Sequence, residues 1–536
     1  MSKFVNTGAS KADKPDTTNS PISRWNVYDS VDQVFSGRTQ PKYGIHGGIC
    51  CSQSQITSIG LYILQCGGGS IDACIAIAAG LSVVEPMSTG IGGDCFVLHY
   101  DSVTHQVEGL NGSGRSPREL HHTHIVDTHA TYDSKDKTKV VGLHPLSVHS
   151  VTVPGAVAGW CDAYDKWSNK KLSLLQLLQP AIDLANNGFV VGSVTAAMWS
   201  TWSNVLRQTE YGSELLKSDG TAPTAGEIMT NKHMGRVLQL IGEHGKSAFY
   251  EGSVGNSIID AMNQRGGLMT QNDLSSHQST LVKPITVQYN GIDIHEIPPN
   301  GSGITVLLAL NIIKKLNLLH KYQHNSVEHL HLLIECMRIA FVDTRWYVTD
   351  SDHSDTRDKH GPIPVQQLLS DEYAQSRAKL FNESKATIDV QRGSPVVSSD
   401  TVSFVAVDNA GNATSFINSL YMGFGSGIVP KQCGFALQNR GANFVIDVDH
   451  PNHLQGNKRP YHTIIPGMAT RNNQLYAPFS VMGGFMYVLY CIVLYCRSYQ
   501  YISIGTQTNT PIYIYVVVFV QATPRSCSDV SSYDRL

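Results

Sequence analysis

Thr401 lies where a polar run meets an alternating apolar pattern, in the stretch SSDTVSFVAVD of residues 398–408. A hydroxyl that follows an Asp–Thr bond can attack the carbonyl before it, and the resulting ester is then open to hydrolysis. Cleavage would leave Thr401 as a new N-terminal residue. Its hydroxyl would act as a nucleophile, and its α-amino group, whose ordinary pKa is about 7.7–8.0, would accept the hydroxyl proton. The alternative interpretation is a threonine that only begins a strand.

Two strands joined by a short turn are predicted to position Thr401. The segments TVSFVAVD and ATSFINSLY, residues 401–408 and 413–421, flank the turn NAGN. Alternation along the first segment puts one set of side chains on each face of the strand. The two sets are Val402, Phe404 and Ala406, and Ser403, Val405 and Val407. Both sets contain apolar residues, so we expect a sheet that is covered on both faces.

Helical patterns dominate the chain before residue 400, and strand patterns follow it. Small apolar residues between 68 and 86 predict a buried helix, and a glycine loop then leads into a strand over 95–100. Residues 327–349 have helical periodicity throughout, whereas residues 350–400 are polar and are predicted to be loop-rich, with SDHSDTRDKHG as an exposed linker. This order of elements predicts a layered α+β sandwich.

The composition argues against several classes of partner and cofactor. Lys and Arg number 40 against 43 Asp and Glu, and no basic stripe with interleaved aromatic residues is present, so we expect no nucleic-acid partner. The 11 cysteines form no CxxC pair, which argues against a disulfide scaffold and against a zinc site. Residues 1–42 lack the apolar segment of a secretory signal and are predicted to be a disordered lead, so we expect a cytoplasmic protein.

Two patterns and the C-terminal tail have a functional and a structural interpretation. Gly90, Gly92 and Gly93 suggest a phosphate cradle, but their loop precedes a strand instead of opening a helix, which favours a tight turn. His331 and Glu335 are four residues apart on a predicted helix, yet no third ligand accompanies them, so a partly solvated helix face is favoured over a metal site.

Residues 487–536 hold two apolar runs of about nine residues each, too short to cross a bilayer, so no membrane association is expected.

Eight stretches, in the same order, resemble the γ-glutamyltranspeptidase family of N-terminal-nucleophile hydrolases, which also includes cephalosporin-acylase-like members. They are GGSIDACIAIAAGLSVVEPMSTGIGGDCFVLHYD, SVTVPGAVAGW, QPAIDLANNGFVV, GGLMTQNDL, DTVSFVAVDNAGNATSFINS, FGSGIVP, NKRPYHTIIP and VMGGF. The resemblance covers residues 43–486 and implies a four-layer αββα sandwich. It also implies a proenzyme that cuts itself before Thr401, with a heavy-chain part over 43–400 and a light-chain part over 401–486 that remain associated. Residues 487–536 form a tail unlike the family.

The resemblance also implies roles for individual residues. Thr401 matches the nucleophile, Ser419 matches a second hydroxyl that hydrogen-bonds it, and Gly483 and Gly484 match the backbone donors of an oxyanion hole. The positions that match substrate-binding residues are Ser113, Arg115, Tyr421, Arg440, Asn443, His462 and Thr463. The implied substrate is a small γ-glutamyl or other N-acyl amide. The chemistry requires no metal and no organic cofactor, because nucleophile, base and charge stabiliser all come from the polypeptide.

The substrate-binding positions differ from those of true γ-glutamyl enzymes, which hold the α-amino group of the substrate with an acid and amide partners. Here Arg440 and Asn443 replace the amide and the acid. An ammonium group would be repelled by Arg440, whereas a carboxylate would pair with it. Arg440 also admits a structural role in an ion pair. The functions left open are a glutathione hydrolase-like enzyme, a cephalosporin-acylase-like hydrolase of another N-acyl amide, an inactive homologue or truncated isoform, and a binding protein with this fold.

Overall fold

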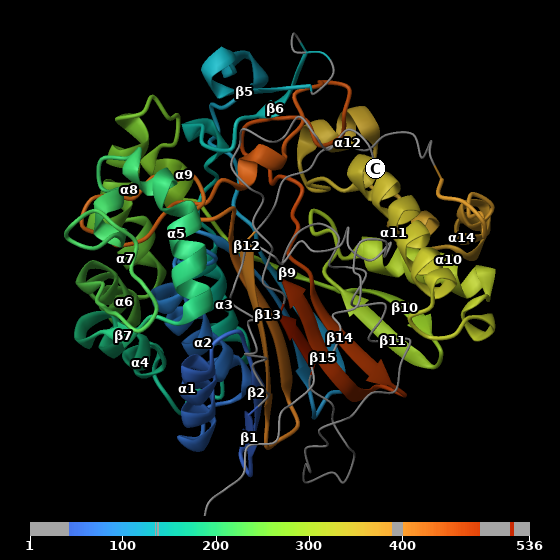
Figure 1. Cartoon of the computed structure of the whole chain (residues 1–536), viewed down its shortest axis with the longest axis horizontal. Coiled ribbons are helices and arrows are strands. Elements are labelled where there is room, and N and C mark those ends of the chain that lie inside the picture. The colour runs from blue at the N-terminus through green and yellow to red at the C-terminus, as the bar shows by residue number, and fades with distance from the viewer. Residues whose placement is uncertain (1–41, 134–135, 137–138, 388–399, 483–514, 519–536) are drawn as a thin grey trace, which may run out of the picture. The chain divides into compact units, whose positions relative to one another are not determined.

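The central sheet contains the predicted strand pair. The computed structural model describes residues 42–133, 136, 139–387, 400–482 and 515–518. Seven strands run in the order β1-β2-β12-β13-β3-β4-β9, and all neighbours are antiparallel. They are β1 (Lys42–Gly44), β2 (Gly47–Cys50), β3 (Asp94–Asp101), β4 (Gln106–Gly112), β9 (Thr280–Val282), β12 (Asp400–Asp408) and β13 (Ala413–Tyr421). The strand that carries Thr401, β12, therefore lies inside this sheet, between β2 and β13 (Figure 1).

A second sheet packs against the first. Its order is β10-β11-β14-β15-β16, in which β15 and β16 are parallel and the other neighbours are antiparallel. The strands are β10 (Ile285–Tyr289), β11 (Ile292–Glu296), β14 (Pro466–Arg471), β15 (Gln474–Met482) and β16 (Tyr515–Val518). Because β12 and β13 contact β15 while β3 contacts β14, the two sheets lie face to face. The apolar core between them includes Phe96, Leu98, Val405, Ile417 and Met468.

Helices cover the outer face of the seven-stranded sheet. Helix α2 (Ser70–Val84) is buried along its whole length and contacts β12 and β13. Its alanines and glycine allow close packing on every side, as the sequence predicts. The other helices on this side are α1 (Ser54–Gln65), α3 (Ala156–Trp167), α4 (Leu174–Asn187), α5 (Ser193–Arg207), α6 (Lys232–His244), α7 (Lys246–Tyr250), α8 (Ser253–Asn263) and α9 (Gln271–Ser275).

A second group of helices covers the five-stranded sheet. Helix α10 (Ile304–Leu316) contacts β10 and β11, and α11 (Val327–Tyr347) packs on α10. Figure 1 shows these two helices and α14 on the opposite side of the sheets from α1 to α4. The remaining helices of this part are α12 (Ser354–His360), α13 (Val365–Leu368) and α14 (Asp371–Ala378). The layers are therefore helix, sheet, sheet and helix, which confirms the predicted αββα sandwich.

Short elements join the layers. Two small antiparallel pairs are β5 (Ala130–Tyr132) with β6 (Val140–Leu143), and β7 (Phe189–Val190) with β8 (Ile228–Met229). The 3₁₀ helices are η2 (His122–His124), η3 (Asp127–His129), η4 (Val148–Ser150), η5 (Gly212–Leu215), η6 (Leu319–Lys321) and η7 (Arg440–Asn443). Both β6 and η4 contact η7, which carries two of the predicted site residues.

The predicted alternation along β12 is confirmed. Val402, Phe404 and Ala406 belong to the apolar cluster that includes the helices of the first layer. Val405 and Val407 belong to the cluster between the two sheets. The strand thus contributes to two cores at once, as expected for a sheet covered on both faces.

The predicted exposed linker SDHSDTRDKHG is wrong, because most of it forms α12, and two more short helices, α13 and α14, follow in the described part of this loop-rich segment. Helix α14 shows why a polar sequence can be helical. The Ser370 hydroxyl accepts a hydrogen bond from the Tyr373 N–H, and Asp371 and Glu372 occupy the first turn, where acidic residues favour a helix. Polar composition hides such a helix from a search for apolar periodicity.

None of the helices in the described part of the chain combines the length and the apolar character that crossing a bilayer requires.

Phe404 provides a test of the two-sided core. Its ring is fully buried and lies 5.1 Å, centroid to centroid, from the ring of Phe416. We expect Phe404→Ala to cost about 3–5 kcal/mol of stability through lost burial and a residual cavity. Thermal unfolding should show a midpoint lowered by several degrees, whereas Val103→Ala, at a side chain that is 85% exposed, should leave it unchanged. Equal midpoints for both variants would contradict this packing.

Candidate active site

Thr401 lies at an irregularity in the central sheet. The pairing of β12 with β13 shifts register between Asp400 and Val402, which leaves Thr401 between two paired positions. Bulges of this kind re-aim side chains and are frequent beside active sites. The Thr401 Oγ1 atom lies 3.0 Å from the Oγ atom of Ser419, within hydrogen-bond distance. The structure therefore brings together the predicted nucleophile and the predicted second hydroxyl.

Ser419 receives two further hydrogen bonds. The Tyr421 N–H donates to its Oγ atom at 2.9 Å, and Nη2 of Arg440 donates to the same atom at 3.0 Å. Tyr421 ends β13 with a φ of 81°, a left-handed conformation that an aromatic residue rarely adopts. Donors that point at a hydroxyl stabilise negative charge on it and on its neighbour. They therefore favour ionisation of the Thr401–Ser419 pair in a reaction.

Arg440 is a fully buried cation beside this pair. Its Nη1 atom donates to Thr463 Oγ1 at 2.7 Å, and its guanidinium stacks 4.5 Å from the centroid of the Tyr421 ring. Burial lowers the pKa of Arg440 to about 10, against the opposing influence of Asp94, so the side chain is still charged at neutral pH. Arg440 makes no ion pair within the described residues. Its contacts are hydrogen bonds to two hydroxyls and stacking on one ring, so its binding role and its structural role both stay predictions.

Asp94 is a site residue that the sequence analysis did not find. It begins β3 and pairs in register with Ser419 of β13, so the two side chains are cross-strand neighbours. Its Oδ1 atom accepts hydrogen bonds from the N–H groups of Gly114 and Gly155 and from Nε2 of Gln438, at 3.0, 3.1 and 2.8 Å. The sequence did contain one feature that could have pointed to Asp94, because this acid directly follows the glycine loop of residues 90–93.

The Asp94 carboxylate is buried yet ionised. Burial by itself would raise its pKa, but the hydrogen bond from His462, the charge of Arg440 and the hydrogen bond from Gln438 outweigh this and hold the pKa below its ordinary value. His462 Nε2 lies 3.1 Å from Asp94 Oδ2, and both side chains are fully buried. Burial and the nearby Arg440 lower the pKa of His462 to about 4. His462 is therefore a neutral donor to Asp94 at neutral pH.

Three buried donors near Arg440 lack acceptors among the described residues. They are Nε of Arg440, Nδ2 of Asn443 and the hydroxyl of Tyr461. Arg440 and Asn443 lie three residues apart on η7, and side chains at this spacing on a 3₁₀ helix project to the same side. Asn452 ties Tyr461 to this helix, because its amide donates to Asn443 O and accepts from Tyr461 N–H. Buried donors without partners can bind the acceptors of a ligand, which makes this region a candidate binding site.

Of the remaining predicted residues, Ser113 and Arg115 are described by the structure, and Gly483 and Gly484 are not. The Ser113 hydroxyl accepts a hydrogen bond from Asn300 Nδ2 at 3.1 Å and has no bond to the Thr401–Ser419 pair. Arg115 is half-buried, and its guanidinium makes no hydrogen bond or ion pair with described residues. The segment is joined to the site by its backbone instead, through Gly114 and Asp94. Gly483 and Gly484 lie outside the described residues, so their predicted role stays a prediction.

The side chains that suggested a metal site serve other contacts. His331 Nε2 lies 2.8 Å from the carbonyl oxygen of Asn382. Glu335 accepts from Nη1 of Arg338 at 2.7 Å and from the Thr387 N–H at 2.8 Å. Both side chains therefore hold the segment that follows α14. A search of the described residues finds no group of three His, Cys, Asp or Glu side chains placed to bind a metal ion.

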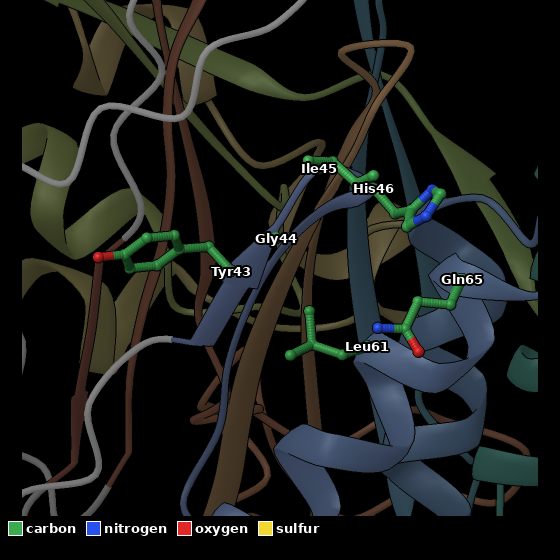
Figure 2. A pocket seen from close by; sticks show the side chains of 6 residues that line it. All are labelled: Tyr43, Gly44, Ile45, His46, Leu61 and Gln65. Atoms are coloured by element: carbon green, nitrogen blue, oxygen red, sulfur yellow. The ribbon is translucent and has the colours of Figure 1, made fainter.

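A cavity of about 450 Å³ lies elsewhere, between the β1–β2 hairpin and α1. Figure 2 shows its six lining residues, Tyr43, Gly44, Ile45, His46, Leu61 and Gln65. None of them belongs to the Thr401 site, so this cavity adds nothing to the chemistry described above.

Comparison with known proteins places this geometry in a family. A family model described as gamma-glutamyltranspeptidase matches residues 56–508. The chain belongs to the γ-glutamyltranspeptidase family. The match extends past residue 486, where the sequence analysis set the end of the resemblance, into residues 487–508, which all lie outside the described part of the chain. Members of this family in the comparison include several proenzymes, and the chain is an autoprocessing hydrolase of the γ-glutamyltranspeptidase type.

Three similar proteins show the breadth of this family. The glutathione hydrolase-like YwrD proenzyme of Bacillus subtilis is 34% identical over 79% of this chain and 76% of its own length. The oxamate amidohydrolase proenzyme of Klebsiella pneumoniae is 29% identical over 82% of this chain and 79% of its own. The solved cephalosporin acylase from Bacillus halodurans is 37% identical, with a TM-score of 0.73, over 86% of this chain and 81% of its own. The family therefore contains hydrolases with different named substrates.

Ser419 provides a test of the candidate active site in this member of the γ-glutamyltranspeptidase family. Ser419→Ala removes the acceptor for Arg440 Nη2 and the hydroxyl beside Thr401, while Ser419→Thr keeps an oxygen in place. Loss of one hydrogen bond to a charged group costs about 1.5–3 kcal/mol. We therefore expect the alanine variant to turn over a substrate about 10- to 100-fold more slowly, measured as kcat, and the threonine variant to stay near wild type. An alanine variant with wild-type kcat would show that Ser419 has no part in the reaction.

Proposed function

We propose that this protein cleaves its own backbone before Thr401 and then uses the freed residue as the nucleophile of an amide hydrolase or acyltransferase. The observation that carries the proposal is the 3.0 Å contact between Thr401 Oγ1 and Ser419 Oγ, which also receives two N–H donors. Membership in a family that includes proenzymes supports it.

In the proposed reaction the α-amino group of Thr401 takes the proton from Oγ1 as this oxygen attacks the carbonyl carbon of the substrate. The bond from Oγ1 to the acyl carbon forms, the carbon–nitrogen bond breaks, and the proton passes to the departing amine. Water, or an acceptor amine, then attacks the ester and regenerates the free hydroxyl. Gly483 and Gly484 are proposed to donate N–H groups to the oxyanion. No metal or organic cofactor takes part in these steps.

The proposed heavy and light chains would remain associated because their strands alternate in one sheet. Strand β12 follows the cut and pairs with β2, which precedes it, and β13 pairs with β3. The local order is β2-β12-β13-β3. Separation would break both ladders and expose the two apolar cores that β12 helps to form.

The first candidate for the acyl donor is a γ-glutamyl amide, as the name of the B. subtilis relative suggests. The second candidate is the amide of an acid that carries a carboxylate and no ammonium group. Arg440, Asn443 and Tyr461 present donors without acceptors, which suits a carboxylate. Asp94, in contrast, already accepts three hydrogen bonds at Oδ1 and one at Oδ2, which leaves it little acceptor capacity for an ammonium group. The name of the K. pneumoniae relative is consistent with the second candidate, because oxamate is such an amide.

Thr401→Ala should abolish both self-cleavage and turnover, because it removes the attacking oxygen from each step. Intact-mass spectrometry should show fragments of residues 1–400 and 401–536 in the wild type and one uncut chain in this variant. Thr401→Ser, which keeps a primary hydroxyl, is the matched control and should still cleave itself. A wild-type chain that turns over substrate without any cut would contradict the proposed function.

A matched pair of substrates separates the two candidate donors. N-Glutaryl 4-nitroanilide and γ-glutamyl 4-nitroanilide differ by the α-ammonium group alone. If the donors around Arg440 receive a carboxylate and the ammonium finds no acid, kcat/KM should be about tenfold higher for the glutaryl compound, since one poorly paired charge costs about 1–3 kcal/mol. A tenfold preference for the γ-glutamyl compound would favour the first candidate instead.

Tyr461→Phe tests whether the Tyr461 hydroxyl binds the acyl group of the preferred anilide. The change removes a buried hydroxyl that has no partner within the described structure, so the stability of the free protein should not fall. If the hydroxyl binds the acyl group, KM for the preferred anilide should rise while the thermal midpoint stays unchanged. An unchanged KM would show that this hydroxyl does not contact the substrate.

A further inference from the structure

Arg440 is linked to the nucleophile by two consecutive hydrogen bonds. Its Nη2 atom donates to Ser419 Oγ at 3.0 Å, and Ser419 Oγ lies 3.0 Å from Thr401 Oγ1. The guanidinium is fully buried and has no ion pair within the described residues, so its charge is poorly screened by solvent. This places a permanent positive charge next to the residue whose α-amino group would become the catalytic base.

Asp94 places a negative charge on the strand next to Ser419. It is the cross-strand neighbour of Ser419, and its carboxylate is fixed by hydrogen bonds to both of its oxygens. Asp94 and Arg440 share no direct hydrogen bond, but each charge shifts the pKa of the other, so the two interact through space. Each therefore acts at a distance on any group that ionises at Thr401.

The other titratable groups around this pair are two neutral side chains and two further cations, Arg345 and Arg459, of which Arg459 helps to lower the pKa of His462. His462, on the segment before β14, is uncharged at neutral pH. Burial raises the pKa of the Tyr421 phenol at the end of β13, so it is also neutral. Arg345 of α11 stacks on the ring of Tyr461, 4.8 Å from its centroid, and acts on Tyr421 from that side. Among the described residues, Arg440 is thus hydrogen-bonded to Ser419 and Asp94 is its cross-strand neighbour.

We propose that the charge of Arg440 keeps the α-amino group of mature Thr401 unprotonated, and therefore ready to act as the base, while the charge of Asp94 limits this effect. The inference rests on the proposed cleavage before Thr401. A nearby cation disfavours a second positive charge, and a nearby anion favours it. Arg440 would then serve the reaction in a way that is separate from binding an acyl group.

The size of the expected effect follows from the ordinary pKa of an α-amino group, about 7.7–8.0. At pH 7 such a group is only about one-seventh unprotonated. A shift of about one unit downward, which one buried charge at this range can produce, raises the unprotonated fraction about fourfold. The acidic limb of kcat/KM against pH reports this group in the free enzyme, before any substrate carboxylate meets Arg440.

Three variants separate the charge of Arg440 from its shape. Arg440→Lys keeps the positive charge but loses the planar guanidinium group. Arg440→Gln removes the positive charge. Asp94→Asn removes the opposing negative charge while keeping one oxygen that can accept from the N–H donors. With the 4-nitroanilide that the wild type prefers, the midpoint of the acidic limb should stay within about 0.3 pH unit for Arg440→Lys. It should rise by about one pH unit for Arg440→Gln and fall by about one for Asp94→Asn. General damage to the site would lower the rates without moving the two midpoints in opposite directions.

Several results would overturn the inference. An Arg440→Gln midpoint equal to or below that of the wild type is one, and an Asp94→Asn midpoint above it is another. If one of the two charge-removing variants does not mature, the other still decides, because each has a stated direction of shift from the wild-type midpoint. Intact mass is measured on every sample first. Turnover by uncut protein would contradict both the proposed function and this inference. Protein that is cut and active, but whose variants keep the wild-type midpoint, would contradict the inference alone.

Discussion

The site depends on a buried guanidinium held against a hydroxyl pair. Arg440 gives up its hydration, and in return it donates to Ser419 and Thr463 and stacks on Tyr421. A buried cation is stable only where polar groups and opposite charge surround it, and breaking such an arrangement is strongly destabilising. Asp94 provides that opposite charge from the adjacent strand. Once this pair of charges is in place, the segments that contain Gly114, Gly155, Gln438 and His462 are bound to one carboxylate and have little freedom to move.

The αββα sandwich makes this arrangement possible because Thr401, the proposed nucleophile, lies at the start of a strand with neighbours on both sides. Strand β12 contributes to the helix-side core and to the core between the sheets, so its position is fixed from both faces. The irregular register at Thr401 then releases one residue from the ladder at the end of a rigid strand. The same interleaving of strands explains how a chain can be cut beside β12 without losing the sheet.

Local patterns in the sequence were sufficient for the elements that hold the site. Alternation along β12 and the small apolar residues of α2 each depend on neighbours within a few positions, and the structure confirms both predictions. Asp94 was missed because its partners lie up to 368 positions away in the sequence, and nothing local distinguishes it from an acid in a turn. Tyr461 was missed for a related reason, since only the fold shows that its hydroxyl is buried without an acceptor. The polar helices α12 to α14 were missed because caps and end charges, and not apolar periodicity, define them.

The most direct test of the central claim is to trap the acyl group on the protein. The mature enzyme is mixed with excess N-glutaryl or γ-glutamyl 4-nitroanilide, quenched in acid within the first turnover, and its light chain is digested and mapped by mass spectrometry. The account predicts one added acyl group, lost on mild alkaline treatment as an ester would be, on the peptide that begins with Thr401. An acyl group on any other residue, or none on a light chain that is still turning over substrate, would contradict it.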